Sequence, residues 1–190
     1  PGDSRTETFV AAKFLLDNWR WSGVPIYLRT GKRMAKKQTS ITVQFKQPPM
    51  KLFQTVACQD DICDLTDTQP NMLTFRIQPD EGISLHFATK RPSMHMVVED
   101  SELDFRYAEN YQGTLPEAYE RLLMDVMRGD ATLFTRSDEV EAAWRIMDPI
   151  LEAWTRFDSH VPLHFYAPGS WGPLAAEQLF DREVGQWRNE

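Results

Sequence analysis

Hydrophobic and polar residues alternate along four stretches of the chain, and this period of two predicts half-buried strands. The apolar positions are 41, 43 and 45, then 73, 75 and 77, then 83, 85 and 87, and finally 103, 105 and 107. Pro79-Asp80-Glu81-Gly82 stands between the second and third stretches. Proline presets φ and glycine supplies a positive φ, so these four residues predict the turn of a β-hairpin.

Apolar residues at helical spacing predict helices near the start of the chain and in its second half. Ser4 and Glu7 form a capping-box pattern ahead of such a stretch, which predicts a helix from Thr6 to Asn18. Two further helices are predicted over Leu115–Arg128, where Gly129 provides the stop, and from Ser137 to Trp154, with a kink at Pro149. We interpret their apolar stripes as core rather than as cofactor sites.

Shorter segments complete the prediction. They are a strand over Val24–Thr30, a loop-like stretch from Pro49 to Asn71, a strand over Leu163–Tyr166 and a short helix over Ala175–Asp181.

Cleanly alternating strands joined by a hairpin favour an α+β fold, with a large, mostly antiparallel sheet and helices packed on one face. At 190 residues the chain is predicted to be a single domain, residues 1–190. The other sheet face is solvated by default, and the alternative is a polar subunit interface. Its residues are Thr42, Gln44, Thr74, Arg76, Gln78, Ser84, His86, Asp104 and Arg106.

Positive charge is concentrated in one stretch, Tyr27 to Lys37 (YLRTGKRMAKK). Five of its residues are basic: Arg29, Lys32, Arg33, Lys36 and Lys37. Subtracting these five charges from the net charge of −7 leaves −12 for the rest of the chain. Local positive charge in an acidic protein favours a site for a small anion such as a phosphate, and disfavours nucleic acid. The alternative is a solvated charged loop.

The sequence offers no catalytic apparatus of its own. Gly31 is the only glycine in the basic stretch, and no two of the nine glycines stand two residues apart, so neither a P-loop nor a dinucleotide fingerprint can be written. Cys58 and Cys63 are interpreted as free thiols, and Pro162 between His160 and His164 argues against a helical metal site. No apolar run exceeds four residues, from which we expect no membrane span, no secretory signal and a cytoplasmic location.

Five blocks of the sequence are long enough to compare with a known family. They are SRTETFVAAKFLLDNWRWSGVPIYLRTGKRM, FRIQPDE, DSELDF, PEAYERLLMDVMRGDATLFTRSDEVEAAWRIMDPIL and YAPGSWGP. In this order they resemble the C-terminal domain of glucose-6-phosphate dehydrogenase. The resemblance implies a parent enzyme that oxidises the C1 hydroxyl of glucose 6-phosphate to 6-phosphogluconolactone and reduces NADP, with some members also using NAD. This reaction opens the pentose phosphate pathway.

The resemblance also implies roles for individual residues. Lys32 in RTGK, Lys37 and Gln78 in RIQP occupy substrate-contacting positions. The family's catalytic histidine and glycine-rich coenzyme domain precede this region. The resemblance thus implies that these 190 residues hold no catalytic or coenzyme-binding residue and are inactive alone, and the spacing of their histidines and acidic residues predicts no metal site.

Some family members carry a second, structural NADP on this domain, bound by basic residues. Arg29 and Arg76 match that pattern, whereas Gln38, Thr42 and His86 stand where basic residues would be expected. We therefore expect no tightly bound NADP here.

The family further implies a homodimer or homotetramer formed through the sheet. Two other hypotheses remain open: a purely structural oligomerisation domain without a ligand site, and a polyanion-binding module, which the acidic remainder disfavours.

Overall fold

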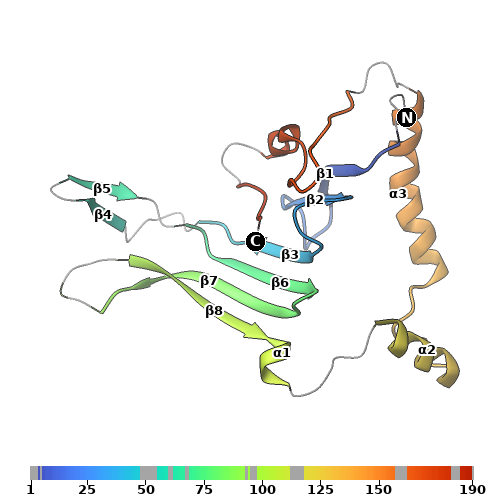
Figure 1. Ribbon diagram of the computed structural model, residues 1–190, viewed down its shortest axis with the longest axis horizontal. Helices are drawn as coiled ribbons and strands as arrows, with labels where there is room; N and C mark the ends of the chain where they lie inside the picture. Colours follow the sequence, from blue (N-terminus) through green and yellow to red (C-terminus); the bar gives the residue numbers. More distant parts are fainter. Residues whose placement is uncertain are drawn as a thin grey trace. The chain divides into compact units, whose positions relative to one another are not determined.

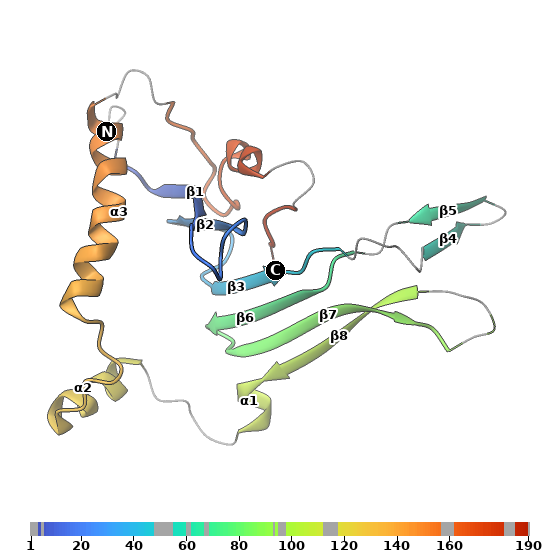
Figure 2. The same ribbon diagram turned by 180° about the vertical axis from the view of Figure 1, so that it is seen from behind.

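A computed structural model describes residues 4, 6–47, 69–92, 94, 98–111, 118–156, 162–180 and 185–189, and the backbone of 55–59 and 62–66. The chain divides into two compact units (Figures 1 and 2). One contains Pro1–Ala35 and Leu115–Glu190, and the other contains Lys36–Thr114. The described residues do not include Leu115, where the second helix is predicted to begin. They also do not include His95 and His160.

The Lys36–Thr114 unit is built on a four-stranded antiparallel sheet in the order β3-β6-β7-β8. These strands are β3 (Thr39–Gln44), β6 (Met72–Gln78), β7 (Gly82–Lys90) and β8 (Val98–Arg106). The predicted hairpin is confirmed, because β6 pairs with β7 in a register that sets Phe75 opposite Ile83. A short helix, α1 (Tyr107–Asn110), follows β8, so the strand predicted to include Tyr107 ends one residue earlier.

The polar face of this sheet is more enclosed than the solvated face expected by default. Thr74 is 2% exposed and Ser84 is fully buried, whereas Ile41 and Leu103 on the apolar positions are more than half exposed. Thr74 and Ser84 are small and lie opposite each other on the two central strands. The Thr74 hydroxyl shares a hydrogen bond of 3.1 Å with that of Thr42 on β3, on the same face.

A second hairpin lies in the stretch predicted to be loop-like. It pairs β4 (Thr55–Gln59) with β5 (Ile62–Thr66), with Cys58 opposite Cys63. The loop prediction was therefore wrong for these residues. Each strand is only five residues long and mixes strand formers such as Val56 and Ile62 with polar residues, so its signal was weak.

The N-terminal segment predicted to be a helix is a strand. β1 (Phe9–Leu15) pairs antiparallel with β2 (Pro25–Gly31), the latter confirming the predicted strand over 24–30. Leu16 and Trp19, which completed the helical pattern, are exposed rather than part of a buried stripe. Strand β2 needs a partner for its backbone hydrogen bonds, and β1 supplies a full ladder, which outweighs the local helical spacing.

Two predicted helices are present as α2 (Ala118–Arg128) and α3 (Ser137–Arg156). Gly129 has φ 71° and ends α2, as predicted, and α3 continues through Pro149. The prediction that their apolar stripes form core was wrong for these residues: Trp144 is 55% exposed and Val126 61%. Among the described elements, none packs broadly against either helix, so these stripes stay uncovered. None of the described helices is long and apolar enough to cross a membrane.

The C-terminal segment covers β1 and β2. The strand predicted over 163–166 was wrong, because residues 162–167 have no strand partner. They run as an irregular segment whose Tyr166 contacts the end of β2 instead. The predicted short helix over 175–181 corresponds to a 3₁₀ helix, η1 (Leu174–Leu179). A stacked pair joins Tyr27 of β2 to Phe180, with ring centroids 4.3 Å apart.

Candidate functional site

The candidate site begins at the basic loop, residues 32–38, which connects β2 to β3. Lys32 belongs to the Pro1–Ala35 unit and Lys37 to the Lys36–Thr114 unit, and both side chains are exposed. The backbone of Lys32 is fixed within its own unit. Its amide donates to the carbonyl oxygen of Thr8 at 2.8 Å, and its carbonyl accepts from the Tyr166 hydroxyl at 2.6 Å. An exposed ammonium therefore stands on an anchored backbone.

Lys37 and Gln78 lie at the same end of the β3–β6 pair. Lys37 comes two residues before β3, whose first residue, Thr39, stands opposite Gln78 at the end of β6. The Gln78 side-chain amide donates to the Thr39 hydroxyl at 3.1 Å, which orients the amide group. The structure thus brings these two of the three predicted substrate residues together at one sheet end.

Arg29, the basic residue on β2, is enclosed by the C-terminal segment. Its guanidinium lies 5.2 Å from the centroid of the Trp171 ring and 4.8 Å from that of Trp187. It donates to the carbonyl oxygens of Trp171 and Arg188, both at 3.3 Å, and to the Asn189 side-chain oxygen at 2.9 Å. In this arrangement, here called the Arg29 clamp, one guanidinium contacts the C-terminal segment at residue 171 and again at residues 187–189.

Burial lowers the pKa of the Arg29 guanidinium, and the nearby Glu177 carboxylate acts in the opposite direction. An arginine guanidinium is not deprotonated in proteins, so the group remains a cation. Glu177 and residues 186–189 line a hollow of about 370 Å³ beside it.

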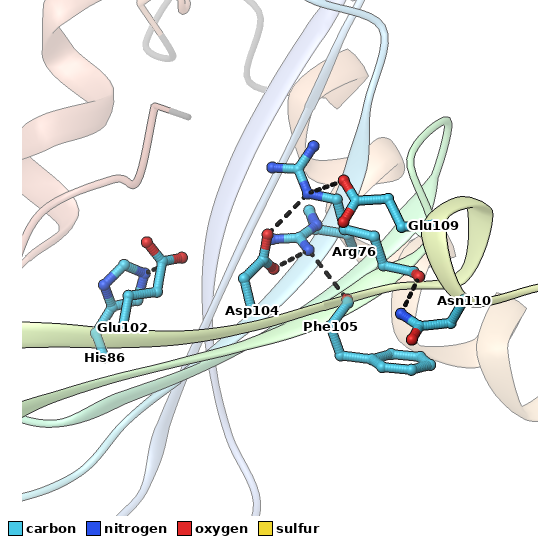
Figure 3. A network of polar contacts seen from close by, with 8 residues as sticks. Arg76, His86, Glu102, Asp104, Phe105, Glu109 and Asn110 are labelled. Carbon is cyan, nitrogen blue, oxygen red and sulfur yellow. Dashed lines mark hydrogen bonds and ion pairs between the residues drawn. The ribbon is translucent and has the colours of Figure 1, made fainter.

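Arg76 is occupied by a polar network on the sheet (Figure 3). Its guanidinium pairs with the Asp104 carboxylate and donates to the Phe105 carbonyl oxygen at 3.3 Å. Arg106 reaches the same carboxylate at 2.7 Å. Hydrogen bonds from Arg106 and then Arg76 hold the pKa of Asp104 below its ordinary value. Nearby, His86 pairs with Glu102 at 3.3 Å.

These contacts bear on a second nucleotide site. Arg29 and Arg76, the two residues matching the basic pattern, each donate to acceptors of the chain itself. Thr42, at a position where a basic residue would be expected, shares a hydrogen bond of 3.1 Å with the Thr74 hydroxyl. That no second NADP is tightly bound to this domain stays a prediction. Among the described residues, no group of His, Cys, Asp and Glu is arranged to hold a metal ion.

Sequence reasoning missed three aromatic residues of this region: Tyr166, Trp171 and Trp187. The available signal was YAPGSWGP, in which two aromatic residues, Tyr166 and Trp171, occur beside glycines at 169 and 172. Both glycines adopt positive φ angles, 81° and 108°. At Gly172 a side chain would have to displace the ring of Phe9, which explains why glycine is found there.

Residues 1–188 match the family model of the glucose-6-phosphate dehydrogenase C-terminal domain. The chain is 47% identical over 186 residues to a glucose-6-phosphate 1-dehydrogenase of Chlamydia pneumoniae. It is 46% identical over 184 residues to that of Mycolicibacterium smegmatis. These alignments cover 98% and 97% of the chain and 35% of each relative, so the chain spans about a third of the relatives' length.

Two solved structures are similar to the whole fold. A crystal structure of glucose-6-phosphate 1-dehydrogenase from Mycobacterium avium matches with a TM-score of 0.74 and 33% identity, over 100% of this chain and 37% of that one. A glucose-6-phosphate dehydrogenase in complex with its substrate glucose 6-phosphate matches with a TM-score of 0.76 and 32% identity, over 96% of this chain and 35% of that one.

Proposed function

The chain belongs to the glucose-6-phosphate dehydrogenase C-terminal domain family, and from this we propose that it supplies part of the glucose 6-phosphate site of such an enzyme. The enzyme would oxidise the C1 hydroxyl of glucose 6-phosphate and transfer a hydride to NADP. The role proposed for these residues is to bind and orient the sugar phosphate. Coenzyme binding and proton abstraction are assigned to parts of the enzyme outside these 190 residues.

The observation that carries this proposal is the anchored backbone beneath the exposed Lys32 side chain. An ammonium group on a long stem acts as a point charge on phosphate. Anchoring its backbone reduces the conformational freedom lost when the anion binds. Lys37 adds a second cation five residues along the chain, which limits the separation of the two Cα atoms to at most about 18 Å.

Gln78 has a different proposed role. Its side-chain amide offers both a donor and an acceptor, which suits sugar hydroxyls better than phosphate. The bond from its amide nitrogen to Thr39 orients the group, so its oxygen is proposed as the acceptor for a hydroxyl of the sugar.

The proposal is tested by Lys32→Ala in the complete enzyme. We expect the KM for glucose 6-phosphate to rise about 10- to 100-fold, the range for losing a hydrogen bond to a charged group. Lys36→Ala is the matched control, because it removes the same charge from the same exposed loop. An unchanged KM in Lys32→Ala, or an equal rise in both variants, contradicts the assignment.

A structural role for the sheet is the second candidate. The network of Arg76, Asp104 and Arg106 gives one sheet face fixed charges of both signs, a surface suited to a self-complementary subunit contact. We propose that the enzyme forms a homodimer or homotetramer through this sheet. Light scattering on the purified enzyme tests this proposal, and a monomer at all concentrations would reject it. If Lys32, Lys37 and Gln78 variants all bind substrate normally, the chain has only this structural role.

A further inference from the structure

The basic loop is held by a segment that lies more than 130 residues later in the sequence. The amide of Gly169 donates to the carbonyl oxygen of Arg33 at 2.8 Å, and the amide of Ala35 donates to that of Ser170 at 3.0 Å. Arg33 has φ 52°, in the left-handed region that residues other than glycine rarely occupy. Such a conformation persists where the surroundings impose it, and the turn at residues 167–170 supplies these bonds.

The Tyr166 hydroxyl is at the point where β2 ends and this loop begins. It lies 2.6 Å from the carbonyl oxygen of Lys32 and 3.1 Å from that of Thr8. Both partners are acceptors and a tyrosine hydroxyl has a single hydrogen, so it donates to one at a time, with the shorter distance favouring Lys32. The Lys32 amide already donates to Thr8. The hydroxyl thus fixes the peptide that follows Lys32 against the end of the strand ladder.

The ring of Tyr166 has a separate role from its hydroxyl. It packs on Phe9 of β1, with ring centroids 5.3 Å apart. Phe9 in turn lies against Gly31 and Gly172, where an added Cβ would meet its ring. The ring therefore belongs to the packing between β1 and the C-terminal segment, whereas the hydroxyl reaches only backbone. Phenylalanine at this position would keep the packing and remove the bond to Lys32.

We infer that Tyr166 is a positioning residue for Lys32: its hydroxyl holds the backbone from which the Lys32 ammonium reaches the phosphate group of the substrate. This inference rests on the proposed function, because it takes Lys32 as the residue that binds phosphate. Tyr166 itself does not contact the ligand. Its effect is to restrict the directions that the Lys32 side chain can take, so that less freedom is lost on binding.

The test is Tyr166→Phe in the complete enzyme. We expect the KM for glucose 6-phosphate to rise about 3- to 10-fold, while kcat and the KM for NADP change less than about twofold. Tyr119→Phe is the matched control, since Tyr119 is exposed on α2 and the change removes the same hydroxyl. It should leave all three parameters unchanged. A general loss of folded structure would lower the active fraction and kcat, so it would not produce this split.

A double-mutant cycle with Lys32→Ala separates this inference from the proposed function. If Tyr166 acts through Lys32, Tyr166→Phe raises the KM in the wild-type enzyme and has no further effect in Lys32→Ala. An equal rise in both backgrounds means that Tyr166 acts elsewhere and overturns the inference. The inference also fails, with the proposed function intact, if Lys32→Ala raises the KM and Tyr166→Phe does not. If Lys32→Ala has no effect, the proposed function fails and the positioning role with it.

Discussion

Arg29→Ala should detach the C-terminal segment from β2 and make the β1–β2 pair open more often. Two antiparallel strands are marginal alone in water, so this pair depends on what packs against it. The clamp closes residues 171 and 189 over Arg29, while Phe180 and Trp187 stack around Tyr27. Losing the clamp therefore removes the cover from β2 without touching the strand ladder itself.

The size of the effect follows from the contacts of the guanidinium. Its two ring contacts contribute roughly 0.5–1 kcal/mol each. Its three hydrogen bonds contribute roughly 0.5–1 kcal/mol each, at the low end because two of them are 3.3 Å long. The alanine variant neither desolvates a charge nor orders a long side chain on folding, and this offsets roughly 1–2 kcal/mol of the loss. The net loss is about 1.5–3 kcal/mol, which corresponds to opening that is about 10- to 150-fold more frequent.

Hydrogen exchange measured by mass spectrometry on the intact protein is the appropriate assay, because it reports opening segment by segment. In Arg29→Ala, amides of β2 should exchange faster by the factor above, and those of β6 and β7 in the other unit should not change. Arg29→Lys should have a smaller effect, since it keeps the charge and loses the planar fork. Arg20→Ala, at an exposed arginine of the same unit, is the control. Unchanged exchange in β2, or an equal increase in β6 and β7, would refute the reasoning.

Three further predictions concern the sheet of the Lys36–Thr114 unit. Gln78→Ala should raise the KM for glucose 6-phosphate about fivefold in steady-state kinetics, the value of one neutral hydrogen bond, and an unchanged KM would remove Gln78 from the site. Gly82→Ala should lower the free energy of unfolding, measured by urea titration, by roughly 1–3 kcal/mol, because the added Cβ would meet the carbonyl oxygen of Phe105. A variant as stable as the wild type would contradict this packing. The pKa of Asp104 is lowered in the folded state. Its ionised form therefore stabilises the fold at pH values above the unfolded pKa of about 3.9, and this stabilisation is lost as the pH falls through the folded pKa. Asp104→Asn should therefore lower the melting temperature at neutral pH, and the gap between the melting temperatures of variant and wild type should shrink on acidification. A gap that does not change with pH would argue against the ion pairs.

Periodicity predicted the sheet well where turn chemistry supported it. The hairpin of β6 and β7 was recoverable because alternation on both sides met a proline and a glycine at the turn, two independent local signals. The β4–β5 hairpin has only five residues in each strand, without clean alternation, and no proline or glycine between them. Its pairing became evident only from the register in the structure.

The error over residues 6–18 has a different cause. A capping box and apolar residues at helical spacing were both present, yet Phe9–Leu15 forms a strand. Local spacing measures which face a helix would bury, and it contains no information on whether a neighbouring strand lacks a partner. Strand β2 had been predicted correctly, and counting its unpaired amides and carbonyls would have indicated that a second strand was needed.

The basic loop shows the same division between local and distant information. Charge is a property of single residues, so the loop could be located from sequence and Lys32 selected by resemblance. What holds Lys32 is a bond to its backbone carbonyl, a group that every residue has, so nothing in the composition around Lys32 indicates it. The informative residue is the donor, Tyr166, whose hydroxyl must find a partner when its ring is packed on Phe9. The sequence signal for this contact is therefore Tyr166 itself, a tyrosine in a segment without regular structure. It lies 134 residues from the carbonyl that it binds.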